Sequence, residues 1–230
     1  MTERAYREWR TGTPGATLWT RRAGPGRSTG LVLPDGCMDV IAVDGELIVA
    51  GPDTHAQRFG GPPGAAYAAV RFDPGVGPAV LGVPAYELRN ARLPLSALWP
   101  QRRVRALADR LAAAPDPATE LVTALAEPLY EAADPWLSWL VAELGRGTPV
   151  GVVAAEAYLS ERHLHRRCRA AFGYGPKTLA RILRMGRALD LARSGRTLVE
   201  VAAAVGYADQ AHLTRDVRAL TGVSPSALLA

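Results

Sequence analysis

The sequence predicts an α+β protein with a β-rich N-terminal part and an all-α C-terminal part. Three observations support this fold class. Short apolar runs separated by Gly and Pro fill residues 1–100, apolar residues recur at helical spacing from about Arg102, and a two-helix pattern occurs twice after residue 146. We therefore expect a β-rich domain in residues 1–100, a short helical bridge in 101–145 and a domain of paired helices in 146–230.

The β-rich part is expected to contain strands at residues 29–34, 38–43, 46–50 and 67–72. Asp44-Gly45 stands between two of these apolar runs, which predicts a type I′ hairpin. The apolar stretches 79–83 and 85–88 fit either a strand or a helix, and the residues leave that choice open. A sandwich or a barrel is the expected architecture.

Helical spacing begins in the bridge. Leu121, Leu125 and Leu129 recur at intervals of four residues. Asp116-Pro117 and Asp134-Pro135 each combine an N-cap residue with a proline at the first helical position. Two or three helices are therefore expected in 102–145, and the Gly-rich segment 145–149 should end them.

The last 80 residues contain two copies of one unit, at 150–176 and 198–225. In each copy a short apolar helix precedes a turn and a second helix, which ends in Gly with Pro three residues later. Ser160 is the expected N-cap of the second helix in the first copy, and Thr197 and Glu200 form a capping box that opens the second copy. Residues 177–194 are expected to form one connecting helix.

The second helix of each unit is amphipathic. In the first copy Leu164 and Cys168 share one face, and Arg166 lies opposite. In the second copy Leu213 and Val217 share a face that leaves Arg215 outside. Two such helices about 34 Å apart would fit successive major grooves of DNA. This pattern predicts paired helix-turn-helix units.

The charge of the chain supports a polyanionic partner. The 230 residues carry a net charge of +5, with −1 in residues 1–135 and +6 in residues 136–230. The apolar runs are too short to span a bilayer, and the N-terminus lacks the apolar core of a secretory signal. The two cysteines do not make a disulfide framework. We expect a cytoplasmic protein without membrane contact.

Residues 150–228 resemble the DNA-binding domain of AraC/XylS-type bacterial transcription regulators, with the closest matches at 159–176, 201–215 and 221–225. Cys168 and Val217 stand where the family usually has Phe, and the common terminal aromatic and Arg are missing. Residues 33–40, 51–55, 70–75 and 81–84 resemble sensor-like N-terminal domains found on some of these regulators. A looser similarity to the arabinose-binding domain implies a cupin-like N-terminal fold.

The resemblance and the helix faces together define the expected DNA contacts. Arg pairs with guanine and Gln with adenine in the major groove. Basic residues nearer the helix edges are expected to hold phosphates. The expected base-reading residues are Arg162, His165, Arg166, Gln210, His212, Thr214 and Arg215, and the expected phosphate contacts are Arg169, Lys177, Arg181 and Arg218. Structural roles are expected for Arg167 and His163.

Candidates for effector binding lie in the N-terminal part. Cys37 is expected to be a buried residue at the start of a strand, and the alternative is a thiol that senses oxidants or electrophiles. Asp39 would orient a ligand or cap a backbone group, and Trp19 is a candidate pocket residue. The five tryptophans all precede residue 140, so we expect core packing for them, with some lining a small-molecule pocket.

Catalysis has no motif to support it. His55 is the only histidine in residues 1–135, and no phosphate-binding Gly-rich loop or nucleophile motif is present. We expect no metal and no cofactor. The favoured interpretation is a regulator that binds promoter DNA under control of a small molecule. A homodimer is a further expected partner, as is RNA polymerase if the protein activates transcription. The alternatives are a Cys37-based sensor and an N-terminal enzyme domain tethered to DNA.

Overall fold

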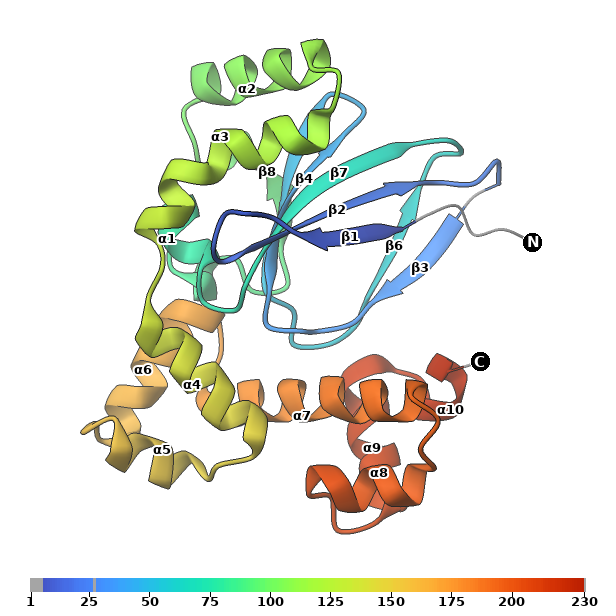
Figure 1. Cartoon of the computed structure of the whole chain (residues 1–230), viewed down its shortest axis with the longest axis vertical. Coiled ribbons are helices and arrows are strands. Elements are labelled where there is room, and N and C mark those ends of the chain that lie inside the picture. Colours follow the sequence, from blue (N-terminus) through green and yellow to red (C-terminus); the bar gives the residue numbers. More distant parts are fainter. Residues whose placement is uncertain (1–5, 27, 230) are drawn as a thin grey trace.

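The computed structural model describes residues 6–26 and 28–229, and the side chains from residue 30 onward in the second range. Figure 1 shows a β-rich N-terminal half and a helical C-terminal half that lies against one end of it. A six-stranded antiparallel sheet has the order β1-β2-β7-β4-β5-β8, and β3 pairs with β6 in a separate two-stranded sheet. The strands are β1 (Arg7–Arg10), β2 (Ala16–Arg22), β3 (Ser28–Val32), β4 (Met38–Val43), β5 (Glu46–Ala50), β6 (Gln57–Gly61), β7 (Ala66–Phe72) and β8 (Arg92–Pro94).

The predicted hairpin is confirmed. Strands β4 and β5 have the expected bounds, and the turn residues Asp44 and Gly45 have φ values of 48° and 82°. A type I′ turn requires positive φ at both positions, which Asp and Gly tolerate. Strands β3 and β7 overlap the other two predicted strands. The sequence prediction missed β1, β2, β6 and β8.

The two undecided stretches are helical. Helix α1 (Gly77–Leu81) has a proline in its first turn and ends at Gly82, whose φ is 79°. The second stretch contains a single turn of 3₁₀ helix, η1 (Ala85–Glu87), and a similar turn, η2 (Leu95–Ala97), follows β8. Apolar periodicity over so few residues fits both helix and strand, which is why the choice stayed open.

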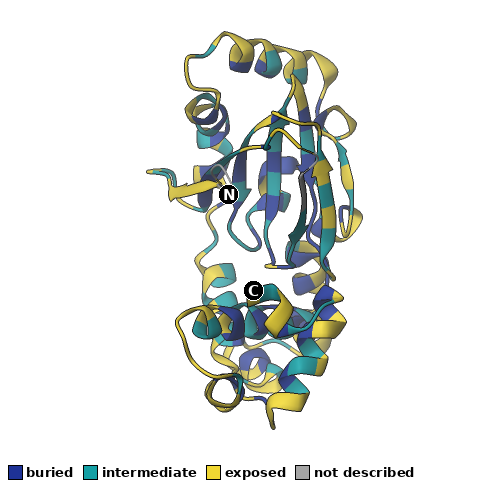
Figure 2. Cartoon of the chain, turned by 90° about the vertical axis from the view of Figure 1, so that its right-hand side faces the viewer, coloured by how far each residue is buried: buried dark blue, intermediate teal, exposed yellow. Residues whose placement is uncertain are grey.

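One face of the six-stranded sheet is covered by helices. Leu18, Val40 and Val70 point from β2, β4 and β7 into this core and have no more than 2% of their surface exposed. Helix α3 (Pro117–Glu131) packs across β2 and β7, and helix α2 (Gln101–Ala113) packs against α3 and β5. Figure 2 shows the buried residues gathered in the layer between the sheet and these helices. The opposite face of the sheet lies outside this apolar cluster.

The segment expected to form a bridge divides between two cores. Helices α2 and α3 belong to the N-terminal core, whereas Leu140 and Leu144 of α4 (Pro135–Arg146) pack into a second core formed by the C-terminal helices. Those helices are α5 (Val150–Glu156), α6 (Glu161–Phe172), α7 (Pro176–Arg193), α8 (Leu198–Val205), α9 (Gln210–Thr221) and α10 (Pro225–Leu229).

The predicted helix caps are present. The side chains of Asp116 and Asp134 accept hydrogen bonds from the backbone N–H groups two residues later, and Ser160 accepts one from His163 N–H. Thr197 and Glu200 form the reciprocal capping box. These side chains satisfy N–H groups that have no partner inside a helix. The predicted fold class, a β-rich domain followed by an all-α domain, is confirmed. No helix in the described ranges is long and apolar enough to cross a membrane.

Candidate nucleic-acid interface and effector site

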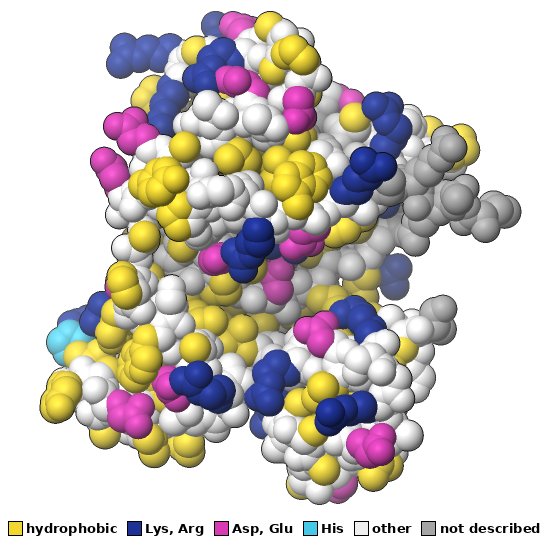
Figure 3. Space-filling model, in the orientation of Figure 1, with side chains coloured by type: hydrophobic (Ala, Val, Ile, Leu, Met, Phe, Trp, Pro, Cys, Tyr) yellow, Lys and Arg dark blue, Asp and Glu magenta, His cyan; other side chains and the backbone are white. Residues whose placement is uncertain are grey.

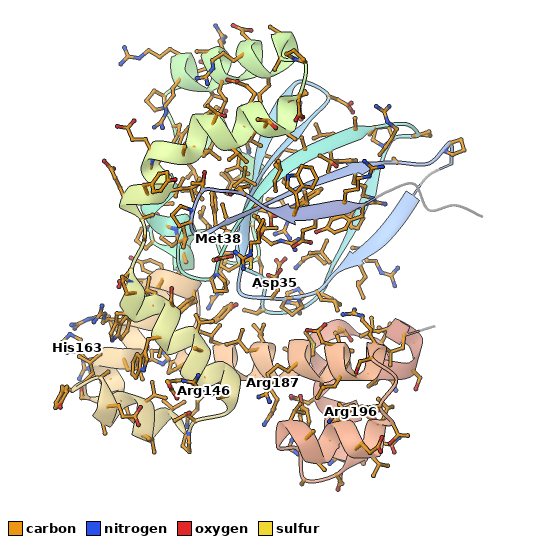
Figure 4. All side chains as sticks on the ribbon, viewed as in Figure 1. Asp35, Met38, Arg146, His163, Arg187 and Arg196 are labelled. Atoms are coloured by element: carbon orange, nitrogen blue, oxygen red, sulfur yellow. The ribbon has the colours of Figure 1, made fainter. Side chains whose placement is uncertain are left out.

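Helix α6 presents a basic face to solvent. Leu164, Cys168 and Phe172 are fully buried in the C-terminal core, and the side chains between them point outward. The predicted base-reading residues Arg162, His165 and Arg166 are all exposed. Arg166 Nη2 lies 2.5 Å from Nε2 of the exposed His163, which is labelled in Figure 4, so His163 contacts a base-reading candidate. Cys168 packs as the small apolar residue that the sequence predicts.

Helix α9 repeats this arrangement in the second unit. Asp209 Oδ1 accepts a hydrogen bond of 2.6 Å from His212 N–H at the start of the helix, and Leu213 and Val217 are buried. Gln210 and Arg215 are exposed, and Thr214 is half-buried. The His212 ring lies edge-on to the Tyr207 ring at 5.1 Å. The candidates on α9 thus divide into the exposed Gln210 and Arg215 and the half-buried His212 and Thr214.

The connecting helix α7 is fastened to α9 by a buried carboxylate. Asp216 has a side chain only 10% exposed, and it is ion-paired with Arg181 and with Arg184, the latter at 3.3 Å. The Tyr207 hydroxyl donates a hydrogen bond of 3.0 Å to the same carboxylate. Burial and the Asp216 charge raise the pKa of Tyr207 to about 12. Arg181, an expected phosphate contact, is therefore occupied by an ion pair within the domain.

The other expected phosphate contacts lie in different surroundings. Lys177 is exposed at the start of α7. The Arg169 guanidinium lies 5.5 Å from the centre of the Tyr86 ring in η1, at the boundary with the N-terminal domain. Arg218 lines a cavity of about 350 Å³ together with His55 and Arg58 of the N-terminal domain. Two of the four candidates are thus close to the N-terminal domain.

Helices α6 and α9 both contact the N-terminal domain at their C-terminal ends. Gly173 after α6 packs against Pro52, and a Cβ on Gly173 would lie 2.8 Å from Pro52 Cγ. Ala56 N–H donates a backbone hydrogen bond of 2.7 Å to the Leu220 carbonyl in α9. The first residues of these helices lie about 18 Å (α6) and about 15 Å (α9) along the helix axis from those contacts. The candidate base-reading residues near the N-termini are therefore left uncovered by this contact.

Three further arginines lie on the face of the C-terminal domain seen in Figure 4, and sequence reasoning did not single them out. They are Arg146 at the end of α4, Arg187 in α7 and Arg196 before α8, and Figure 3 shows dark blue side chains across the same face. Arg187 Nη1 donates a hydrogen bond of 2.5 Å to the Gly145 carbonyl, and Arg146 is ion-paired with Glu143. Their charge contributes to the positive potential of this domain.

A polar cluster occupies the face of the six-stranded sheet opposite to helices α2 and α3. Arg71 in β7 and Asp39 in β4 are register partners, with 3.4 Å between Arg71 Nε and Asp39 Oδ1. Asp35 and Glu8 also lie within 4 Å of the guanidinium, at 3.8 and 3.6 Å. Trp19 Nε1 in β2 donates a hydrogen bond of 2.6 Å to Asp39 Oδ1. The expected ligand residues Trp19 and Asp39 are therefore brought together, and Arg71 is the member that the sequence analysis missed.

The electrostatics of this cluster are perturbed by burial. Burial raises the pKa of Asp39 to about 6, although Arg71 and the Trp19 hydrogen bond act in the opposite direction. Burial alone would lower the pKa of Arg71, but the charges of Asp39 and Asp35 outweigh it and raise that pKa. Three carboxylates surround a single guanidinium, so the cluster carries excess negative charge when all of them are ionised.

Cys37 lies at the edge of this cluster, beside the Gly36 that contacts helix α7. It is half-buried, and burial of the thiol raises its pKa well above the ordinary value, with Asp35 adding to the effect. A raised pKa keeps the thiol protonated at neutral pH, which disfavours the reactive-thiol alternative. Gly36 next to it lies against Leu179 of α7, and burial raises the pKa of the Tyr174 hydroxyl, with the charge of Asp35 adding to the effect. The 35–37 loop thus joins the polar cluster to α7.

The tryptophans divide between the two halves. Trp99 is buried in the N-terminal core, and Trp19 is half-buried beside Asp39. Trp136 and Trp139 on α4 pack against the C-terminal core, where the Arg167 guanidinium lies 3.5 Å from the centre of the Trp136 ring. That contact agrees with the structural role expected for Arg167. Core packing was the wrong expectation for Trp9, which is 42% exposed on β1, the edge strand of the sheet, where one side of the strand has no neighbour to bury it.

Within the described ranges, no group of three or more His, Cys, Asp or Glu residues is arranged to hold a metal ion. The sequence of residues 153–230 matches the family model described as a helix-turn-helix domain. Residues 16–94 match the model described as a domain of unknown function (DUF6597). No curated protein matches the sequence.

Solved structures of ToxT from Vibrio cholerae are similar to the whole chain. ToxT of strain O395 bound to (E)-4-(8-methylnaphthalen-1-yl)but-3-enoic acid superposes with a TM-score of 0.50 at 12% identity, covering 94% of this chain and 98% of that one. Wild-type ToxT of strain SCE256 with bound unsaturated fatty acid has a TM-score of 0.49 at 12% identity, with coverages of 96% and 97%. The first similarity shows a common fold, in which a β-rich domain precedes a helical one.

Proposed function

We propose, from the premise that residues 153–230 form an AraC-type helix-turn-helix domain joined to an N-terminal domain of unknown function, that this chain regulates transcription by binding promoter DNA. The observation that carries the proposal is the pair of N-capped helices α6 and α9. Each buries an apolar face and leaves basic and polar side chains exposed near its N-terminus. Helix α7 connects them, so that each helix enters its own major groove.

The base contacts are assigned by chemistry. Arginine presents two N–H groups that match guanine O6 and N7, and the glutamine amide matches adenine. We assign base reading to exposed and half-buried residues in the N-terminal halves of α6 and α9, and phosphate binding to basic residues beside them. To bind a phosphate, Arg181 would have to give up its ion pair with Asp216. Lys177 is exposed and can bind a phosphate without breaking such a pair. The base-reading set is Arg162, His165, Arg166, Gln210, His212, Thr214 and Arg215, and the phosphate set is Arg169, Lys177, Arg181 and Arg218.

The experiment is a titration of the full chain with the DNA upstream of its own gene at several salt concentrations. Each phosphate contact releases counterions, so log K should fall steeply with log salt concentration. An unrelated duplex of equal length measures the non-specific component. A flat salt dependence, or equal affinity for both duplexes, would refute sequence-specific DNA binding.

We further propose that the polar cluster around Arg71 binds a small-molecule effector. Trp19, Asp39 and Arg71 offer a donor, an acceptor and a charged group on one face of the sheet. A bound effector would shift the 35–37 loop, which contacts α7 at Leu179, and so change the arrangement of the two domains. Regulation requires the effector to bind the two arrangements with different affinity.

A thermal-shift screen of metabolites against the full chain tests this site, because a ligand that binds only the folded protein raises its melting temperature. Asp39→Asn is the control, since a hit that binds the cluster should lose its effect in this variant. A hit that stabilises both proteins equally binds elsewhere. The proposal places the protein in the cytoplasm of a bacterium and assigns no reaction to the N-terminal domain. A homodimer is a further proposed partner, and RNA polymerase is another if the protein activates transcription.

A further inference from the structure

Tyr158 combines two unusual properties in the turn between α5 and α6 (Figure 1). Its side chain is 96% exposed, more than that of any other large hydrophobic residue in the described ranges. Its φ is +53°, in the left-handed region. The other two described non-glycine residues with positive φ are Asp44 and Asn90, whose residue types tolerate this conformation well. The left-handed backbone gives the exposed Tyr158 side chain no packing contact within the chain that would offset its steric cost.

The second unit fills the same place with glycine. In the first unit Leu159 N–H bonds to the Ala154 carbonyl at 2.9 Å, and in the second Tyr207 N–H bonds to the Ala202 carbonyl at 2.9 Å. The residue before each donor has left-handed backbone, Tyr158 in one unit and Gly206 with φ of 81° in the other. Tyr158 therefore corresponds to Gly206. Tyr207, which the sequence repeat aligns with Tyr158, is instead buried against Asp216.

The turn holds Tyr158 beside the end of α6 that carries the base-reading candidates. Ser160, the N-cap of that helix, is two residues away, which limits the separation of the two Cα atoms to about 7.6 Å. A helix that enters the major groove by its N-terminus passes between two phosphate backbones about 12 Å apart. If α6 enters the groove in this way, an exposed side chain at the turn before it lies at the rim of the groove, near one of these backbones. Tyrosine is among the uncharged residues that bond to DNA phosphates.

We infer that Tyr158 contacts the sugar–phosphate backbone at the edge of the groove entered by α6, with its hydroxyl donating a hydrogen bond to a phosphate oxygen. This assignment rests on the proposed DNA-binding function. It explains why a bulky aromatic residue occupies a position where glycine would be free of steric cost. The contact orients the first unit without reading sequence, and it needs no charge.

The test uses the full chain, with the DNA upstream of its own gene and an unrelated duplex of equal length. Tyr158→Phe removes the hydroxyl, and Tyr158→Asn removes the ring while tolerating left-handed backbone. Both variants should bind both duplexes about 3–10-fold more weakly, as expected for one lost hydrogen bond. The slope of log K against log salt should stay unchanged, because a neutral contact releases no counterion. Tyr130→Phe, at a 60% exposed tyrosine of α3, should bind as wild type.

Thermal unfolding measures the backbone strain at Tyr158 separately from its contact with DNA. Tyr158→Gly should melt at a higher temperature than wild type and still bind DNA more weakly. Wild-type affinity in Tyr158→Asn and Tyr158→Phe would overturn the inference while leaving the proposed function intact. A loss confined to the specific duplex would also overturn it, because it would show base reading. Absence of salt-dependent binding by the wild type would instead refute the proposed function itself.

Discussion

Asp216 of α9 is ion-paired with Arg181 of α7, so one carboxylate fixes the second recognition helix to the connecting helix. Replacing it with alanine leaves two arginines and the Tyr207 hydroxyl without their acceptor. We expect Asp216→Ala to lower the free energy of unfolding by about 2 kcal/mol, since losing one partner of a buried pair exposes the cost of burying the other. Urea denaturation measures the change.

The control for this variant is Asp190→Ala. Asp190 pairs with Arg193 at 3.2 Å on the surface of α7, where both side chains are more than half exposed. Exposed pairs contribute about 0–1 kcal/mol, so this variant should unfold nearly as wild type. Equal effects of the two substitutions would show that Asp216 is not a structural link.

Gly173→Ala and Gly222→Ala form a matched pair. The two glycines end the recognition helices with φ of 82° and 78°, so alanine costs about 1 kcal/mol of backbone strain at either site. A new Cβ meets nothing within 4 Å at Gly222 but lies 2.8 Å from Pro52 and 3.2 Å from the Ala85 carbonyl at Gly173. We expect Gly173→Ala to be clearly the more destabilising in calorimetry. Limited proteolysis should also show looser contact between its domains, and equal loss in both variants would contradict the close packing at Gly173.

Asp39 should make stability fall as pH rises. Its pKa is about 6 in the folded protein and 3.8 in the unfolded chain, so between these values the native state holds a proton that the unfolded state has lost. Relative to Asp39→Asn, the wild type should lose about 2 kcal/mol of unfolding free energy between pH 4 and pH 7. Denaturant titrations of both proteins at each pH give the difference. A difference that does not vary with pH would place the carboxylate of Asp39 in an ordinary environment.

Substitutions of Arg166 and Lys177 should weaken DNA binding in different ways. Arg166→Ala should cost about 1–3 kcal/mol on the upstream DNA and relax its sequence preference. Lys177→Ala should weaken specific and non-specific binding alike and reduce the salt slope by about 1. Footprinting and salt titration distinguish the two outcomes. Arg167→Ala, whose guanidinium stacks on Trp136, should retain both the footprint and the slope.

Local signals in the sequence predicted much of the helical half. Capping residues such as Asp134 and Ser160 act on N–H groups two or three residues away, so a short stretch contains all the information. The same holds for the Asp44-Gly45 turn. The outward residues of α6 follow from helix geometry alone, because its apolar residues leave one face that must be solvent-exposed.

The β-rich half was harder because its elements depend on distant partners. Strand β1 is exposed along its whole length and exists through pairing with β2, so it shows no apolar alternation. The cluster around Arg71 joins β1, β2, β4, β7 and the 35–37 loop, and only sheet order brings the strands together. Tyr158 was missed for another reason, because its residue type gives no sign of left-handed backbone, and the backbone geometry was needed to match it to Gly206.

The N-terminal domain contacts the C-terminal end of both α6 and α9, at Gly173 after α6 and at Leu220 in α9. The separation of the two helices is therefore set by the β-rich domain as well as by α7. An effector that released only one of these contacts would alter the operator spacing that the protein prefers while leaving the recognition of each half-site unchanged. Response to a signal would then appear as a choice between promoters whose half-sites differ in their distance along the DNA.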